Sequence, residues 1–232
     1  MPARGKFIAL EGVDGSGKRT QLELLAREFA KRGIVHTRVG FPHYEGFFGQ
    51  MVAQFLNGEF GALDAVDAHF SALLFAGDRL EAKEKLEAEM AQGKTLLADR
   101  YIGSNLAHQG ARVLRDRREE FLAWLKKLEY EVYGLPAEDL VVYVRLPAAE
   151  AQRLIGMKGA RDYTRLQRDI LESSLTHLEA ASEVYDRLAK EPNWVTIECF
   201  DPARRVMRSP EEIHRAVLAA VDARLLSAIS AT

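Results

Sequence analysis

Residues 7–20 read FIALEGVDGSGKRT, an apolar run that passes through three glycines to a lysine and then opens into a helical pattern. Gly12, Gly17 and Lys18 have the G-x-x-x-x-G-K spacing of a Walker A motif, which requires a strand before it and a helix after it. Glycines let the backbone curl so that successive N–H groups point at phosphate oxygens, beside the partial positive charge of a helix N-terminus. The stretch therefore predicts a phosphate-binding loop in which Lys18 reaches the terminal phosphates.

The composition sets the class of protein around this loop. The chain has 232 residues, a formal net charge of −2 and one cysteine, Cys199, which cannot form an internal disulfide. A nearly neutral chain has no generic electrostatic reason to bind nucleic acid or an anionic membrane. No apolar run approaches the roughly 20 residues that span a bilayer, and the N-terminus lacks the apolar region of a signal peptide. We expect a cytoplasmic protein that binds neither nucleic acid nor membranes.

Strand and helix patterns alternate along the rest of the chain. Apolar runs typical of buried strands occur at 7–11, 34–40, 95–99, 140–146 and 194–199, and each is separated from the next by helical periodicity. A strand, helix and strand with a phosphate loop at the first turn imply a right-handed crossover and a parallel sheet. The pattern predicts an α/β fold, a doubly wound and roughly five-stranded parallel sheet flanked by helices, in one domain over 1–232.

An acid and a guanidinium stand together where the run at 95–99 ends. Asp99 is its last residue and Arg100 follows directly. These groups suit a metal and a phosphate respectively, and in P-loop proteins such an aspartate reaches the Mg²⁺ region. An Asp-Arg pair in an exposed turn is the alternative interpretation. We predict a Mg²⁺ site at Asp99.

The phosphate loop is irregular at Arg19. Ser or Thr normally follows the lysine and its hydroxyl holds Mg²⁺, whereas here the threonine comes one residue later, at Thr20. We expect Thr20, or Asp99 and neighbouring acids such as Asp14, to take over the metal. As a hypothesis, Arg19 adds positive charge near the phosphates.

Two further segments supply candidate ligand contacts. Tyr44 follows the second predicted strand, at the sheet edge where open α/β folds bind ligands. Phe75 and Arg79 are four residues apart in a helical pattern at 64–92 and therefore share one helix face. The alternative is that Phe75 belongs to the core and Arg79 is a solvated surface charge.

A basic segment at about 153–168 lacks apolar periodicity. It carries Arg153, Lys158, Arg161, Arg165 and Arg168. Most segments of this kind are flexible surface loops. In a phosphate-transfer enzyme the same composition suits a short basic lid that closes over the transferred group and excludes water. We select Arg153, Arg161 and Arg168 as charge donors.

Five motifs occur in the order and spacing seen in thymidylate kinases, and the chain resembles this family of P-loop nucleoside monophosphate kinases over nearly its whole length. They are EGVDGSGK at 11–18, FPHY at 41–44, LFAGDR at 74–79, DRY at 99–101 with Ser104 and Asn105, and GLP at 134–136. The phosphate loop alone fits any P-loop NTPase, but DRY together with the LFAGDR helix is far more specific. The resemblance implies an ATP-dependent dTMP kinase of dTTP biosynthesis, which uses Mg²⁺, converts dTMP to dTDP and is usually a homodimer.

The resemblance also implies roles for individual residues. It implies ATP binding by Gly12, Val13, Asp14, Gly15, Ser16, Gly17, Lys18, Arg19 and Thr20. It implies dTMP binding by Asp14, Tyr44, Phe75, Arg79, Arg100, Ser104, Asn105 and His108. In this set Asp14 contacts the sugar 3′-hydroxyl, Phe75 stacks on thymine, Arg79 recognises the base edge and Arg100 holds the acceptor phosphate. The catalytic set is Lys18, Asp14, Arg100, Arg161 and Arg153, which suffices because phosphoryl transfer needs mainly positioning and charge stabilisation.

Two alternatives stand beside this reading. The first is a kinase for another pyrimidine monophosphate, such as dUMP or a modified deoxynucleotide, since stacking on Phe75 tolerates ring substitution. His108 also departs from the family, in which several members carry Tyr near the sugar. The second is a nucleotide-binding protein without kinase activity, in which the irregular Arg19 reflects lost metal handling. Against the second, Phe75, Arg79 and Arg100 are acceptor-side groups that an ATP-binding switch does not need.

Overall fold

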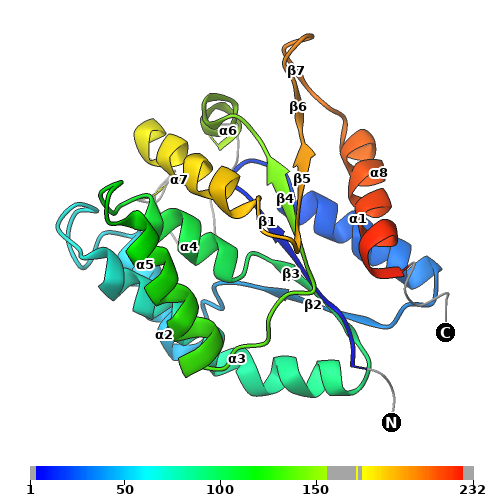
Figure 1. The fold of residues 1–232 in the computed structure, drawn as a ribbon, viewed down its shortest axis with the longest axis horizontal. Coiled ribbons are helices and arrows are strands. Elements are labelled where there is room, and N and C mark those ends of the chain that lie inside the picture. The colour runs from blue at the N-terminus through cyan, green and yellow to red at the C-terminus, as the bar shows by residue number, and fades with distance from the viewer. Residues whose placement is uncertain (1–3, 156–170, 172–173, 227–232) are drawn as a thin grey trace.

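The computed structural model describes residues 4–155, 171 and 174–226, and a parallel five-stranded sheet lies at the centre of this part of the chain (Figure 1). The strand order is β2 (His36–Gly40), β3 (Thr95–Asp99), β1 (Phe7–Glu11), β4 (Leu140–Arg145) and β5 (Trp194–Glu198). Every residue of β1 is buried, because strands lie on both sides of it and helices cover both faces. The predicted sheet is confirmed, and the phosphate loop leaves its central strand.

Helices form a layer on each face of the sheet (Figure 1). One layer consists of α1 (Lys18–Lys31) and α8 (Pro210–Val221). The opposite layer consists of α3 (Ala68–Ala91), α4 (Ile102–Gly110) and α7 (Leu175–Leu188), with α2 (Phe47–Leu56) packed on α3 and α5 (Arg118–Lys126) packed on α4. The short helix α6 (Ala148–Ile155) follows β4 and lies at the edge of the sheet where the strands end.

One helix starts later than predicted, and two helices end in π-helical turns. The helix predicted from residue 64 begins at Ala68, because the Asp67 carboxylate caps it by accepting from the backbone N–H groups of His69 (2.7 Å) and Phe70 (3.3 Å). Helix α5 continues into a π-helical turn, η1 (Lys127–Val132). A second π-helical turn, η2 (Asp222–Leu226), follows α8.

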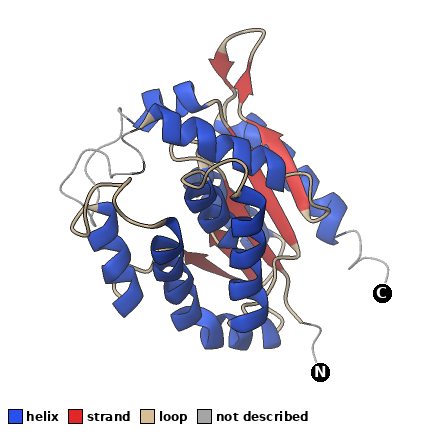
Figure 2. Ribbon diagram, turned by 60° about the vertical axis from the view of Figure 1, so that its left-hand side comes forward, coloured by secondary structure: helices blue, strands red, loops and turns tan. Residues whose placement is uncertain are grey.

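A small antiparallel hairpin was not predicted. Its strands, β6 (Phe200–Asp201) and β7 (Val206–Met207), have two residues each, too few to show a period. It projects from the sheet beyond β5 (Figure 2). The predicted lid falls mainly on 156–168, outside the described residues. In the described part of the chain, no helix is long and apolar enough to cross a bilayer.

Candidate active site

The phosphate loop connects β1 to α1 and packs beneath α6. Gly15 has a φ of 85°, a left-handed conformation that favours glycine. A Cβ atom at this position would lie 2.8 Å from the backbone oxygen of Ala151 on α6. The sequence therefore needs glycine here both for the turn and for the close approach of α6.

Lys18 is the first residue of α1, and its side chain folds back over the loop. Its Nζ donates to the backbone oxygens of Gly12 (2.9 Å) and Val13 (3.0 Å). Burial, and secondarily the charge of Arg100, lower the pKa of Lys18 to about 8. The loop thus holds a buried ammonium group whose proton is unusually easy to remove.

Arg19 and Thr20 have a different environment from Lys18. Both side chains are exposed on the first turn of α1, and Arg19 Nε lies 3.2 Å from Glu23 Oε1 one turn along the helix. Nothing in these surroundings supports the expected charge contribution of Arg19 or the expected metal contact of Thr20, and both remain predictions.

Glu11 is a site residue to which the sequence motif gave no role. This last residue of β1 is completely buried, and its Oε1 accepts from the backbone N–H groups of Tyr101 (2.7 Å) and Ser104 (3.0 Å). Its Oε2 accepts from the hydroxyls of Ser104 (2.6 Å) and Tyr185 (3.1 Å). A carboxylate is favourable there because unpaired N–H groups and positive partial charge gather at the N-terminus of a helix. Glu11 thereby joins the strand before the phosphate loop to the start of α4.

Arg100 links the end of β3 to the phosphate loop. Its Nη2 donates to Asp14 Oδ1 (2.6 Å), and its Nη1 donates to Ser104 Oγ (2.9 Å) and to the backbone oxygen of Gly12 (3.3 Å). Its φ of 67° is left-handed, which costs free energy in a residue other than glycine and is found at functional sites. The neighbouring Asp99 has a buried Oδ1 atom with no hydrogen-bond partner among the described residues.

A pocket beside the ion pair of Arg100 and Asp14 brings together all eight residues predicted to bind dTMP. It is lined by Asp14, Tyr44, Phe75, Arg79, Arg100, Ser104, Asn105 and His108, together with Phe41, Pro42, Leu56, Tyr101, Gln109 and Leu171. Its walls come from the segment after β2, from α2, α3 and α4, and from the end of β3. Apolar walls with a few converging polar groups are typical of a small-molecule site.

A buried ion pair sits against one wall of the pocket. Arg79 is 2% exposed, so the alternative that it is a solvated surface charge is wrong. Its Nε and Nη2 donate to the two carboxylate oxygens of Glu129, at 2.5 Å and 2.7 Å. Asn105 Nδ2 donates to the same Glu129 (2.8 Å) and to the backbone oxygen of Ala72 (3.0 Å). Glu129 lies in the turn η1 and had no sequence signal beyond its place in a helical pattern.

Three polar atoms on α4 are buried without a hydrogen-bond partner among the described residues. They are Asn105 Oδ1, His108 Nε2 and Gln109 Nε2, and all three residues line the pocket. Leaving such an atom unpaired costs about 1–3 kcal/mol, so each one calls for a ligand atom or a water. Sequence reasoning missed Gln109, although its position four residues after Asn105 puts both on one helix face.

His108 stands beside a second histidine. Its Nδ1 lies 3.4 Å from Nε2 of His177, and the two rings stack with 5.6 Å between their centroids. Burial, followed by the charge of Arg100, lowers the pKa of His108 well below its usual range, and burial lowers that of His177 to about 4. Both rings are therefore neutral at pH 7.

Of the three arginines predicted to act from the lid, one lies in the described part of the chain. Arg153 lies on α6, which covers the phosphate loop, and its Nε lies 3.0 Å from Glu150 Oε2. Arg161 and Arg168 lie outside the described residues. The structure therefore brings the loop and the acceptor residues together and leaves the contribution of the lid as a prediction.

Comparisons with known proteins match this chain to thymidylate kinases. The family model for thymidylate kinase matches residues 10–209. The thymidylate kinase of Mycobacterium tuberculosis is 32% identical over 203 residues, 85% of this chain and 94% of that protein. A probable thymidylate kinase of Thermococcus gammatolerans is 32% identical over 234 residues, 97% of this chain and 100% of that protein. In a solved structure, thymidylate kinase from Candida albicans has a similar fold, with a TM-score of 0.74 at 19% identity over 96% of this chain and 93% of that one.

Proposed function

Because this chain belongs to the thymidylate kinase family, we propose that it transfers a phosphoryl group between two sites, the phosphate loop for ATP and the pocket beside Arg100 for dTMP. The family gives the reaction: the chain is an ATP-dependent dTMP kinase. One observation carries the assignment of the acceptor site, namely that the residues expected to bind dTMP line a single pocket next to the phosphate loop.

The acceptor nucleotide is proposed to bind in three parts. Phe75 is half-buried in the pocket wall and offers a ring face for stacking on thymine, while Arg79 and Asn105 meet the base edge. Asp14 takes the 3′-hydroxyl of the sugar, near Tyr44, Ser104 and His108. Arg100 holds the acceptor phosphate, with its guanidinium already fixed by Asp14.

The donor is proposed to bind across residues 12–20. Backbone N–H groups of the loop cradle the phosphates, and Lys18 donates to the transferred group in place of the two loop carbonyls. A positively charged group that is fixed in place stabilises the charge that develops during transfer. Arg153 and Arg161 are the proposed additional cations.

Mg²⁺ is proposed to arrive with ATP. The buried Oδ1 of Asp99, which has no hydrogen-bond partner in the described part of the chain, suits a cation or one of its water ligands. In proteins Mg²⁺ commonly binds through one or two carboxylates plus substrate phosphates, so Asp99 with Asp14 or Thr20 would be enough. When bound, the ion would neutralise charge on the phosphates.

We propose that the protein forms a homodimer through one face of α3. Phe70, Leu73 and Leu80 are 43%, 38% and 39% exposed and recur at helical spacing, and α2 adds the 68% exposed Phe47. Exposed apolar side chains gathered on one face mark interaction sites. Leu73→Glu should convert a dimer to a monomer in light scattering, and a monomeric parent protein would contradict the proposal. The cytoplasmic location remains a prediction from the sequence.

The substrate assignment is tested by measuring ADP release with dTMP, dUMP and dCMP as acceptors. We expect dTMP to have the highest kcat/KM, and a tenfold advantage for another acceptor would overturn the assignment. Phe75→Ala should raise the KM for dTMP much more than the KM for ATP. An equal loss for both substrates would contradict stacking on Phe75.

A further inference from the structure

A small hydrophobic core, separate from the main one, lies behind the acceptor pocket. Its buried side chains come mainly from α2, from α3 and from the connection between them, and are Val52, Phe55, Leu56, Val66, Leu74 and Leu171. We call it the satellite core. Tyr44 and Phe75 pack against it and also line the pocket, and Leu56 and Leu171 belong to both. The wall proposed to stack on the base therefore rests on the satellite core.

Phe55 is the member of the satellite core whose ring contacts Phe75. Phe55 is completely buried, and the two rings meet edge to face, with 6.2 Å between their centroids and 89° between their planes. Edge-to-face contact is a preferred arrangement of aromatic rings, so it favours one orientation of each ring relative to the other. The orientation of Phe75 therefore depends on where Phe55 is held.

Phe55 also contacts a guanidinium, that of Arg112, which follows α4. Cζ of Arg112 lies over the Phe55 ring, 5.5 Å from its centroid. A cation over a ring face is attracted to it, and the attraction increases when water is excluded. Phe55 therefore links Arg112 to Phe75.

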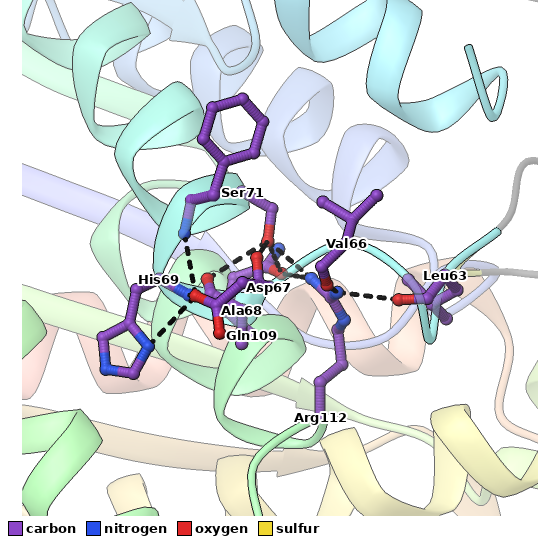
Figure 3. Close-up of polar contacts among 9 residues, drawn as sticks. Leu63, Val66, Asp67, Ala68, His69, Ser71, Gln109 and Arg112 are labelled. Carbon is purple, nitrogen blue, oxygen red and sulfur yellow. Dashed lines mark hydrogen bonds and ion pairs between the residues drawn. The ribbon is translucent and has the colours of Figure 1, made fainter. Parts of the chain in front are cut away.

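The same guanidinium fixes the backbone between α2 and α3 (Figure 3). Its Nη2 donates to the backbone oxygens of Leu63 (2.8 Å) and Val66. Its Nη1 donates to Ser71 Oγ on α3 and to Gln109 Oε1 on α4, the latter at 2.7 Å. One side chain thus joins the connection, α3 and α4, and reaches α2 through Phe55.

This position requires the shape of an arginine rather than positive charge alone. Burial lowers the pKa of Arg112, an effect that the Asp67 carboxylate opposes. The four groups that accept its hydrogen bonds are two carbonyls, a hydroxyl and an amide oxygen, all of them neutral. A charge with neutral partners is costly to bury, and the compact ammonium of a lysine lacks the planar fork that reaches these acceptors.

We propose that Arg112 is a positioning residue for the acceptor site, whose fork holds the satellite core against α4 and thereby keeps Phe75 oriented for stacking on the base. Arg112 is not among the described residues that line the acceptor pocket. It acts instead through Phe55 and the backbone of residues 63–66. The inference rests on the proposed function and adds the support on which the stacking wall depends.

Arg112→Lys tests the proposal with the charge retained. We expect the KM for dTMP to rise about tenfold, with kcat and the KM for ATP within about threefold, because the fork is lost and the ATP site is untouched. A merely structural weakening would lower the folded fraction, and hence the apparent kcat, without moving the KM for dTMP. An unchanged KM for dTMP in Arg112→Lys would overturn the proposal.

Arg118→Lys is the matched control for this measurement. Arg118 is also partly buried, but it donates to the backbone oxygen of Gly110 (3.0 Å) and pairs with Glu183 (3.5 Å) instead of the satellite core. We expect both KM values to stay close to those of the parent protein. An equal rise of the KM for dTMP in both variants would contradict a specific role of Arg112.

A double-mutant cycle tests the route through Phe55. Phe55→Leu should itself raise the KM for dTMP, because it removes the ring that contacts both Arg112 and Phe75. If Arg112 acts through this ring, adding Arg112→Lys should raise the KM by less than the product of the two separate effects. A rise equal to that product would show that the two residues act independently and would overturn this route.

A cavity at the surface allows a chemical rescue. Arg112 lines a cavity of about 760 Å³ whose other lining residues include the exposed Leu114. Methylguanidinium added to Arg112→Ala should lower the raised KM for dTMP at least threefold, whereas methylammonium at the same concentration should not, because it has no fork. Equal effects of the two salts would overturn the proposal. A parent protein that does not phosphorylate dTMP would instead refute the proposed function, which keeps the two failures distinct.

Discussion

Arg100 and Asp14 form an ion pair with 2.6 Å between Nη2 and Oδ1, and it joins the end of β3 to the phosphate loop. Both side chains are more than three-quarters buried, so solvent weakens their attraction little. Both residues line the acceptor pocket, and Arg100 also donates to Gly12 of the phosphate loop. A guanidinium that is already fixed needs no reorganisation when charge develops during transfer.

We predict that Arg100→Lys lowers kcat/KM for dTMP by about a hundredfold or more, because lysine cannot replace the contacts to Asp14, Ser104 and Gly12 together. Steady-state kinetics at saturating ATP measure the effect. Arg205→Lys is the matched control, since Arg205 is the other non-glycine residue with a left-handed φ among the described residues but is exposed in the hairpin turn. Similar kcat/KM values in both variants would contradict the role of Arg100.

Glu129→Gln should weaken both folding and dTMP binding. Removing one partner of a buried ion pair leaves Arg79 charged and uncompensated, which costs about 3–5 kcal/mol. The KM for dTMP should rise with little change in the KM for ATP, because Arg79 and Asn105 lose their common anchor. Urea unfolding and kinetics measure the two effects. The exposed Glu131, in the same π-helical turn, gives the control Glu131→Gln, and equal destabilisation by both changes would refute the prediction.

ATP binding should take up protons near pH 8. With a pKa of about 8, Lys18 is about half neutral at that pH, and the negative charge of bound phosphates raises the pKa again. We expect uptake of about half a proton per ATP, measured by calorimetry in buffers of different ionisation enthalpy. Lys18→Met should abolish this uptake and most of the turnover. Equal uptake in the variant would mean that another group titrates.

His177 should make the fold sensitive to acid. Its pKa falls from 6.5 in the unfolded chain to about 4 in the fold, so the unfolded chain binds the extra proton and stability falls as pH decreases from 6.5 to 4. The loss reaches up to about 3 kcal/mol for this group. His177→Phe should flatten the dependence of unfolding free energy on pH in that window, while exposed His69→Phe should not. If the unfolding free energy changes with pH equally steeply in His177→Phe and in the parent protein, the assignment of this acid sensitivity to His177 is contradicted.

The fold was predictable because its signals are local. The buried run of β1 and the glycine spacing after it lie within one short window, and the parallel sheet follows from their order along the chain. The two-residue strands β6 and β7 give no such signal, and the start of α3 depended on capping by Asp67 rather than on periodicity.

The acceptor pocket was predictable only as far as motifs reached. Phe75 and Arg79 were identified through the family resemblance, but Glu129 lies 50 residues from Arg79 in sequence. Glu11 likewise contacts Tyr101 across 90 residues, and Gln109 accepts a hydrogen bond from Ser71 across 38. Residues that the fold brings together from distant positions give no signal in a short stretch of sequence. The structure was therefore needed to identify the groups that orient the site residues.

The buried contacts of Glu11 matter for engineering the acceptor specificity of this enzyme. The Glu11 carboxylate joins the strand before the phosphate loop to the start of α4. The distance between the proposed ATP site and the acceptor pocket is therefore set by these buried hydrogen bonds. Pocket residues further along α4, such as Asn105 and Gln109, can then be randomised in a library without altering that distance. Selection for new nucleotides should therefore begin beyond Ser104 and keep Glu11 constant.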